Sequence, residues 1–237
     1  MGQYSLAQHV FVCVNDEHVV LLDLRADRYW ALEAAKTAPL AGLVPGWPVH
    51  PQAGAANDPG DAQEVAEALC DQGILSGPDA QGKDATPVTP APAKRELLSQ
   101  DEDKRAPVTL VAVLRFVAAS VTAKASLRLT PFERVIRRFT AQKRAGLATA
   151  QPLDPQAARQ LVQTFARLRV FFFTSKNECL FDSLALLGFL ARYGIYADWV
   201  FGVQARPFAA HCWVQKDEVV FNDTVEHVSG YTPIMTA

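Results

Sequence analysis

Residues 171–190 read FFFTSKNECLFDSLALLGFL, and this stretch predicts a long apolar helix with a cysteine, Cys179, in its first turn. Ser175 and Glu178 have the spacing of a capping box, in which each side chain satisfies a backbone N–H at the helix start. Asn177 is a competing N-cap, and either choice leaves Cys179 in the first turn. The apolar residues that follow recur at spacings of about three and four, as a buried helix requires.

Two interpretations of Cys179 follow from that position. At a helix start the unpaired N–H groups and the helix dipole favour the thiolate over the thiol, and a thiolate is the better nucleophile. Free cysteine is also among the most buried residue types, so the alternative is a small core residue without chemistry. The residues downstream favour the nucleophile.

A β-hairpin is predicted downstream by two short β-prone runs, residues 208–215 and 219–223, with the polar residues KDE between them. If Gln215 pairs with Val219, then His211 lies directly opposite Asp223, with Cβ atoms about 4.5–5.5 Å apart. The carboxylate can then orient the imidazole, which is the base-and-orienter arrangement that a cysteine nucleophile requires. The turn lacks the glycine that usually occupies a left-handed position.

Five short motifs lie within residues 171–223: ECL at 178–180, FGV at 201–203, PF at 207–208, AHCWV at 210–214 and ND at 222–223. Together they resemble the B proteins of microcin-type maturation, which are the leader peptidases of lasso-peptide biosynthesis. The combination is much more specific than any one motif.

The resemblance implies a transglutaminase-like, papain-related α+β fold with a Cys-His-Asp triad. By the match, Cys179 is the nucleophile, His211 the general base and acid, and Asp223 the residue that orients His211. One departure is the Phe181–Asp182 pair, where many members carry an arginine, so a role of that arginine is not carried over.

The first residues predict a smaller domain with a three-stranded meander at 9–14, 18–24 and 29–32. A weak helical stretch at 33–44, broken near Pro39, and a better helix at 61–72 follow. This order is similar to the PqqD-like recognition element for ribosomally made peptides, which implies that an extended leader peptide binds between the third strand and the second helix by β-augmentation. The leader-binding residues are then Tyr29, Trp30, Ala31, Leu32, Val65 and Leu69. The alternative is that this domain merely braces the catalytic part.

Prolines punctuate residues 79–107, so we expect a linker between a domain at 1–78 and a catalytic domain at 108–237 that is helical up to residue 169. A basic run lies within 124–144, formed by Lys124, Arg128, Arg134, Arg137, Arg138, Lys143 and Arg144. Such a run is typical of a solvated helix face, and the functional alternative is a docking surface for a partner cyclase or for acidic parts of the precursor. Nucleic acid is disfavoured because aromatic residues are not interleaved with the charges.

The composition of the chain further narrows the class of protein. The 237 residues carry a formal net charge of −2, and the four cysteines have no framework spacing, which predicts reduced thiols in the cytoplasm. We expect no metal, because His211 and Cys212 are neighbours on a strand and should point to opposite faces, although His227 and Asp223 are further candidate ligands. The longest apolar stretch, residues 108–121, is shorter than the roughly 20 residues of a membrane span and predicts a core helix.

The expected function is therefore that of a cysteine endopeptidase that binds and cleaves the leader of a lasso precursor. Cleavage would free the core N-terminal amine for macrolactam formation by an asparagine-synthetase-like lasso cyclase. No cofactor is expected, and any dependence on ATP would come through the cyclase. Two alternatives remain open, a non-catalytic adaptor that binds the precursor and another Cys-His-Asp acyl transferase or amidase.

Overall fold

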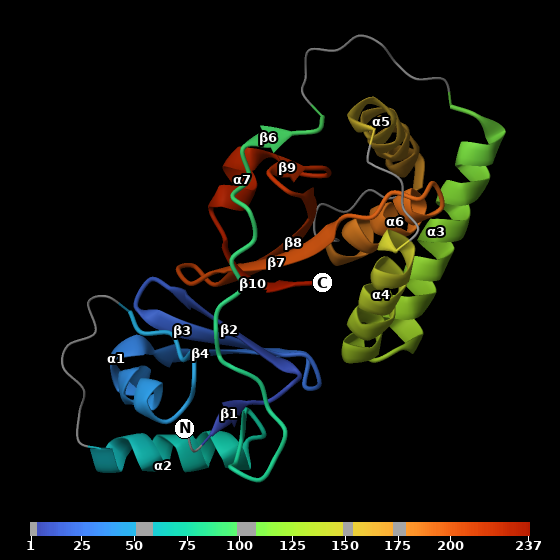
Figure 1. Ribbon diagram of the computed structural model, residues 1–237. Coiled ribbons are helices and arrows are strands. Elements are labelled where there is room, and N and C mark those ends of the chain that lie inside the picture. The colour runs from blue at the N-terminus through green and yellow to red at the C-terminus, as the bar shows by residue number, and fades with distance from the viewer. Residues whose placement is uncertain (1–3, 51–58, 99–107, 149–153, 173–178) are drawn as a thin grey trace. The chain divides into compact units, whose positions relative to one another are not determined.

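The computed structural model describes residues 4–50, 59–98, 108–148, 154–172 and 179–237 (Figure 1). They form two compact units, each assembled from several segments of the chain. The first unit contains Met1–Thr89, Gly202–Ala210 and Thr232–Met235, and the second contains Pro90–Phe201, His211–Tyr231 and Thr236–Ala237. The mixture of helices and sheets confirms the α+β class.

An antiparallel meander forms the centre of the first unit, as predicted. Its strands β2 (Val10–Asn15), β3 (His18–Asp23) and β4 (Arg28–Glu33) pair in the order β2-β3-β4. Asp16 and Asp27 lie in the two turns with φ of 50°, a left-handed conformation that aspartate tolerates better than most residues. A second, two-stranded sheet pairs β1 (Ser5–Leu6) with β5 (Leu75–Ser76), and the sequence did not predict it.

Short helices follow the meander. The weak helical stretch becomes α1 (Ala34–Thr37) and the 3₁₀ helix η1 (Ala38–Gly42), with Pro39 in the first turn of η1. The better helix is α2 (Pro59–Asp71), which packs against η1 and β5. Val10, Val19, Leu21, Leu40 and Ile74 are fully buried between these elements and form the core of this unit.

The side chain of Asn15 connects the meander to later segments of the same unit. Its Nδ2 donates to the Thr232 hydroxyl at 2.7 Å, and its Oδ1 accepts from the Ala205 N–H at 2.7 Å. The rings of Tyr29 and Phe208 meet edge to face at 5.6 Å between centroids. These contacts explain why residues 202–210 and 232–235 belong with the first unit.

The segment expected as linker has structure before residue 99. Lys83 and Leu6 exchange backbone hydrogen bonds of 2.8 and 2.7 Å, and the Ala85 side chain is buried. Strand β6 (Arg95–Glu96) pairs in parallel with β9 (Val219–Val220) in the second unit. Residues 99–107 lie outside the described residues, and the expected division at 78 and 108 stays a prediction.

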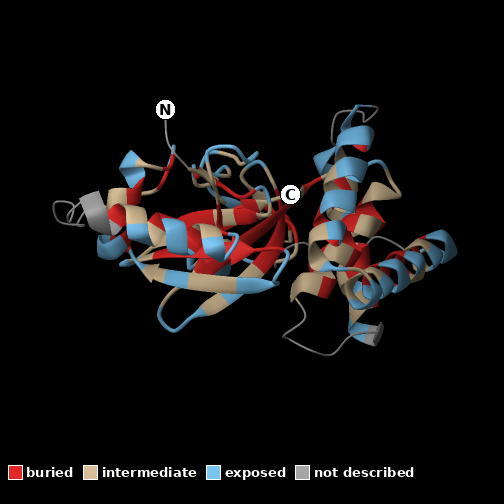
Figure 2. Cartoon of the chain, turned by 90° about the horizontal axis from the view of Figure 1, so that it is seen from below, coloured by how far each residue is buried: buried red, intermediate tan, exposed pale blue. Residues whose placement is uncertain are grey.

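Four helices follow β6 in the second unit, in agreement with the helical prediction: α3 (Leu110–Leu129), α4 (Phe132–Leu147), α5 (Pro155–Phe172) and α6 (Cys179–Ala191). Helix α6 packs on α3 and α5, and its residues 185–187, 189 and 190 are buried. Gly194, with φ of 75°, follows the helix end, and the next N–H returns to the Leu190 carbonyl at 3.1 Å. Figure 2 shows buried residues along the strands, while the outward faces of the helices are exposed.

The main sheet has the order β10-β7-β8-β9-β6. Its strands β7 (Asp198–Gln204) and β8 (Ala209–Lys216) are followed by β9, by helix α7 (Val225–Ser229) and by β10 (Thr232–Thr236). The predicted register of β8 and β9 is wrong by one residue, since Lys216 rather than Gln215 pairs with Val219. The physical reason is Asp217, which takes a φ of 51° and so closes a two-residue loop without a glycine.

In the described part of the chain, α3 is the helix long and apolar enough to cross a membrane, judged by length and composition alone. Leu110 and Leu129 on it are 74% and 83% exposed, whereas Phe116 and Ala119 are buried. A core helix of a soluble protein passes the same test, so this is weak support for a span. The absence of a membrane span stays a prediction.

Candidate active site

Cys179 is the first residue of α6, as the sequence predicts. The capping residues proposed for this helix, Ser175, Asn177 and Glu178, lie outside the described residues. The thiol is partly buried and can therefore lose a proton only if other groups stabilise the thiolate.

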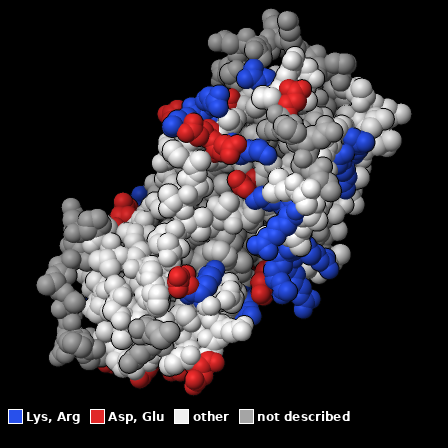
Figure 3. All heavy atoms as spheres, viewed as in Figure 1, with Lys and Arg blue, Asp and Glu red and all other residues white. Residues whose placement is uncertain are grey.

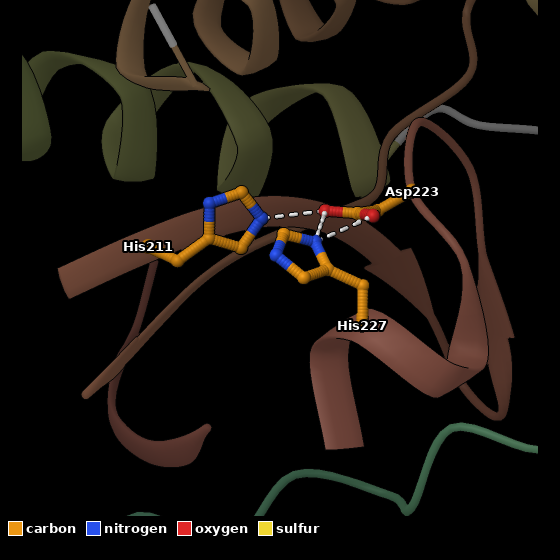
Figure 4. Close-up of side chains that lie close together, drawn as sticks. All are labelled: His211, Asp223 and His227. Atoms are coloured by element: carbon orange, nitrogen blue, oxygen red, sulfur yellow. Dashed lines mark hydrogen bonds and ion pairs between the residues drawn. The ribbon is translucent and has the colours of Figure 1, made fainter. Parts of the chain in front are cut away.

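His211 on β8 and Asp223, which follows β9, lie side by side (Figure 4). The His211 Nε2 and the Asp223 Oδ2 are 2.5 Å apart, and both side chains are largely buried. The expected contact thus forms in spite of the wrong register, because the β8–β9 ladder ends at Val220 and the chain that follows brings Asp223 to the imidazole. Since Nε2 faces the carboxylate, Nδ1 is the ring nitrogen left for Cys179.

The pKa values of Cys179, His211 and Asp223 are shifted in the directions that favour a nucleophilic thiolate. Hydrogen bonds from Cys212 and His211 lower the pKa of Cys179 from 9.0 to about 4, against the effect of burial. Burial alone would lower the pKa of His211, but hydrogen bonds to Asp223 and Cys179 raise it from 6.5 to about 9. Hydrogen bonds from His211, Thr224 and His227 lower the pKa of Asp223, although burial opposes them. The site therefore favours a thiolate, an imidazolium and a carboxylate together.

Cys212 belongs to the site, which the sequence argument missed. Strand alternation predicts that its side chain points away from that of His211, yet both residues lower the pKa of Cys179. Burial and the neighbouring Cys179 raise the pKa of Cys212, so it remains a thiol that can donate. Ser183 donates to the Cys212 carbonyl at 3.3 Å, and because Ser183 lies one turn after Cys179, this bond turns the same face of α6 toward β8. The alternation of side chains along β8 predicts only the two faces of that strand. It does not predict that the start of α6 packs against the strand.

A polar network fixes the chain just before Asp223. Asn222 accepts from the Val214 N–H at 2.8 Å and donates to both Asp182 and Ser183 on α6 at 3.1 Å. Arg169 on α5 donates to the same Asp182 carboxylate at 2.9 Å. Asp182 belongs to the Phe181–Asp182 pair that departs from the pattern of the family that the sequence resembles, and here it holds Asn222.

His227 on α7 is the second histidine at the Asp223 carboxylate. Its Nδ1 lies 2.9 and 3.0 Å from the two carboxylate oxygens. The sequence argument weighed His227 only as a metal ligand, although four residues from Asp223 is the spacing at which side chains can meet across one turn. Among the described residues, His211, Asp223 and His227 form the cluster with ligand atoms close enough for a metal, within 4.8 Å of one another.

The residues expected to bind a leader peptide lie on two elements of the first unit. Tyr29, Trp30, Ala31 and Leu32 lie on β4, which pairs with β3, and Ala31 is exposed. Val65 on α2 is half-buried and packs against the core, whereas Leu69 is buried within it. Trp30 and Leu32 also pack partly against that core.

Known proteins support part of this interpretation. Residues 117–236 match the family model of the transglutaminase-like superfamily, and they include Cys179, His211 and Asp223. No curated protein and no solved structure matches the chain.

Proposed function

The chain belongs to the transglutaminase-like superfamily, and from this premise we propose that it is a cysteine endopeptidase that removes the leader of a lasso-peptide precursor. The observation that carries the proposal is the hydrogen bond between His211 and Asp223, together with Cys179 at the start of an apolar helix, where Cys212 and His211 lower its pKa. The motifs at residues 171–223 supply the substrate class.

The reaction follows from the roles that the geometry allows. The Cys179 thiolate attacks the scissile carbonyl carbon, and the N–H of Cys179 at the helix start can donate to the oxyanion. His211, as the imidazolium, protonates the departing amine, which leaves with the core peptide. Neutral His211 then takes a proton from water, whose oxygen attacks the acyl-enzyme and releases the leader as a carboxylate.

Strand β4 is proposed to hold the leader. In the part of the chain that the structure describes, β4 is the last strand of its sheet, and such an edge can accept an extended peptide through main-chain hydrogen bonds. Ala31 and Val65 have exposed surface for contact, whereas the buried Leu69 would only shape the floor. Binding energy far from the scissile bond would then position that bond at Cys179.

The partner is proposed to be the cyclase that uses the freed amine. Six of the seven residues in the basic run are exposed, and Lys143 instead pairs with Asp198. Figure 3 shows Lys and Arg side chains gathered over α4. An acidic surface on the cyclase would complement this face. We propose that this chain uses no cofactor. We also propose that it works in a reducing cytoplasm, in keeping with its four free cysteines.

The test uses the precursor peptide encoded beside this protein. It is mixed with the chain, with and without the neighbouring cyclase and ATP, and the products are identified by mass spectrometry. Native protein should cleave one leader–core bond, and Cys179→Ala should not, whereas Cys70→Ala on α2 is the matched control and should cleave normally. Binding of the precursor without cleavage in any mixture would favour a non-catalytic adaptor. Transfer of an acyl group to an added amine without hydrolysis would favour a transglutaminase.

A further inference from the structure

The Asp223 carboxylate is held by three donors, and this arrangement goes beyond a triad. His211 Nε2 contacts Oδ2 at 2.5 Å, the Thr224 N–H donates to Oδ1 at 2.8 Å, and His227 Nδ1 lies about equally far from both oxygens. An ionised carboxylate only accepts hydrogen bonds, so each ring nitrogen that faces it carries the proton. Neutral His227 is therefore the Nδ1–H tautomer, and its ring points at the carboxylate in Figure 4.

The position of His227 is itself fixed. Thr224 caps α7 by accepting the His227 N–H at 3.1 Å, and the Val225 N–H donates to Glu96 at 2.9 Å. The ring packs against those of His211 and Tyr231, with centroids 4.7 and 5.5 Å away. With 51% of its side chain exposed, His227 covers the solvent side of a carboxylate that is only 16% exposed.

We propose that His227 is a positioning residue, which holds the Asp223 carboxylate in the plane that presents Oδ2 to His211. The inference rests on the proposed function, since it assigns a role in the same triad. Rotation about the last bond of an aspartate side chain is broad, and the contacts of His211 with Oδ2 and of the Thr224 N–H with Oδ1 restrict it only in part. A donor placed between both oxygens removes that freedom.

We expect the loss of His227 to impair proton transfer and to leave substrate binding unchanged. Without His227, the carboxylate supports the His211 imidazolium less well, which lowers the His211 pKa and weakens the stabilisation of the Cys179 thiolate. The other titratable groups around this turn are Tyr231, Glu226 and Glu96. Among the described residues, the side chains that hydrogen-bond to Asp223 are those of His211 and His227. The effect therefore belongs to His227.

The experiment compares His227→Leu, which removes the donor, with His227→Asn, whose amide N–H can take the place of Nδ1–H. Precursor cleavage by His227→Leu should lose about tenfold in kcat with KM unchanged, less than the ≈ 10⁴ lost when a triad carboxylate itself is replaced by its amide. His227→Asn should recover most of the loss. Glu226→Ala, on the exposed face of the same turn, is the matched control and should equal the native protein.

A second readout does not depend on the substrate. The rate of Cys179 alkylation by iodoacetamide is measured against pH, and its midpoint should rise in His227→Leu and return toward the native value in His227→Asn. An unchanged alkylation midpoint in His227→Leu would overturn the proposal, as would equal damage in the Leu and Asn variants, which would indicate a packing role. If native protein cleaves no precursor, the proposed substrate fails while the alkylation profiles still decide the role of His227.

Discussion

Cys179 and His211 stabilise each other's charged forms, although both are partly buried. Because the pKa of Cys179 falls to about 4 while that of His211 rises to about 9, the thiolate–imidazolium pair is the dominant form between those two values. Below the lower pKa the thiolate gains a proton, and above the higher one the imidazolium loses its proton. The site is thus ready for nucleophilic attack across the neutral range.

The first prediction concerns this pH range. Alkylation of Cys179 by iodoacetamide should be nearly independent of pH from 6 to 8, since both limits lie about a unit or more outside it. His211→Ala removes a hydrogen bond and a positive charge, so the Cys179 pKa should rise, and the rate at pH 6 should fall by up to about tenfold for each unit by which that pKa exceeds 6. Peptide mass spectrometry gives the rate.

Cys70 provides an internal control in the same sample. Burial and the carboxylates of Asp71 and Glu67 raise its pKa, so its alkylation at pH 6 should be slow in native and variant protein alike. Equal rates for Cys179 in native protein and His211→Ala at pH 6 would contradict the paired charges.

The elements could be predicted from the sequence where local pattern determines them. Apolar runs separated by polar turns predicted the meander β2 to β4, and the apolar spacing of residues 180–190 predicted α6. The register of β8 and β9 could not be predicted, because Asp217 adopts the left-handed conformation for which a glycine was expected. The bond between Arg169 and Asp182 joins two helices, and no local pattern in either helix specifies its partner. The contact of His211 with Asp223 was predicted correctly from a wrong register, so its success owes more to motif resemblance than to pairing arithmetic.

A second prediction tests the β8–β9 turn. Asp217→Val forces a β-branched residue to a φ of 51° and should destabilise the protein by about 1–2 kcal/mol, the cost of the left-handed conformation. Asp217→Gly should be tolerated, since glycine adopts that conformation freely. Midpoints of urea unfolding compare the two variants, and equal midpoints would mean that the turn carries no strain.

The third prediction tests the network between Asn222 and α6. Asn222→Asp places a second carboxylate about 3.1 Å from Asp182, with Arg169 as the cation that both must share. We expect a loss of about 1–3 kcal/mol in the free energy of unfolding and a lower kcat, because donors are lost and the chain at Asp223 shifts. Urea unfolding and precursor cleavage measure the two effects.

A double variant separates repulsion from general damage. Asp182→Asn in the Asn222→Asp background restores a donor and acceptor pair with the charges exchanged, so part of the stability should return. If the loss of unfolding free energy in the double variant equals the sum of the losses in the two single variants, the residues do not interact.

At the scale of the whole molecule, charge is distributed unevenly around a formal net charge of only −2. The basic run on α3 and α4 has six exposed members, which sets this face apart from the acidic balance of the chain. A single exposed cation contributes little to the attraction of a partner protein. Several cations on one face attract an acidic partner over about a Debye length, which is ≈ 8 Å at physiological salt.

The fourth prediction tests this face as a docking surface. Replacing Arg134 and Arg137 by Glu should weaken association with the cyclase at least about tenfold and remove most of its salt dependence. Affinity is measured by calorimetry at two salt concentrations, and urea unfolding checks that the variant is folded. The matched control is Arg159→Glu together with Arg167→Glu on α5, and an equal loss there would mean that only net charge matters.

The contacts of Asn15 limit how this protein can be re-engineered. A chimaera that exchanged only residues 1–89 for those of a relative would remove the partner of the Ala205 N–H and of the Thr232 hydroxyl. The transferable module is therefore discontinuous and consists of Met1–Thr89, Gly202–Ala210 and Thr232–Met235. A graft designed to change the specificity of this protein has to replace all three pieces together, or keep Asn15 and the backbone that it binds.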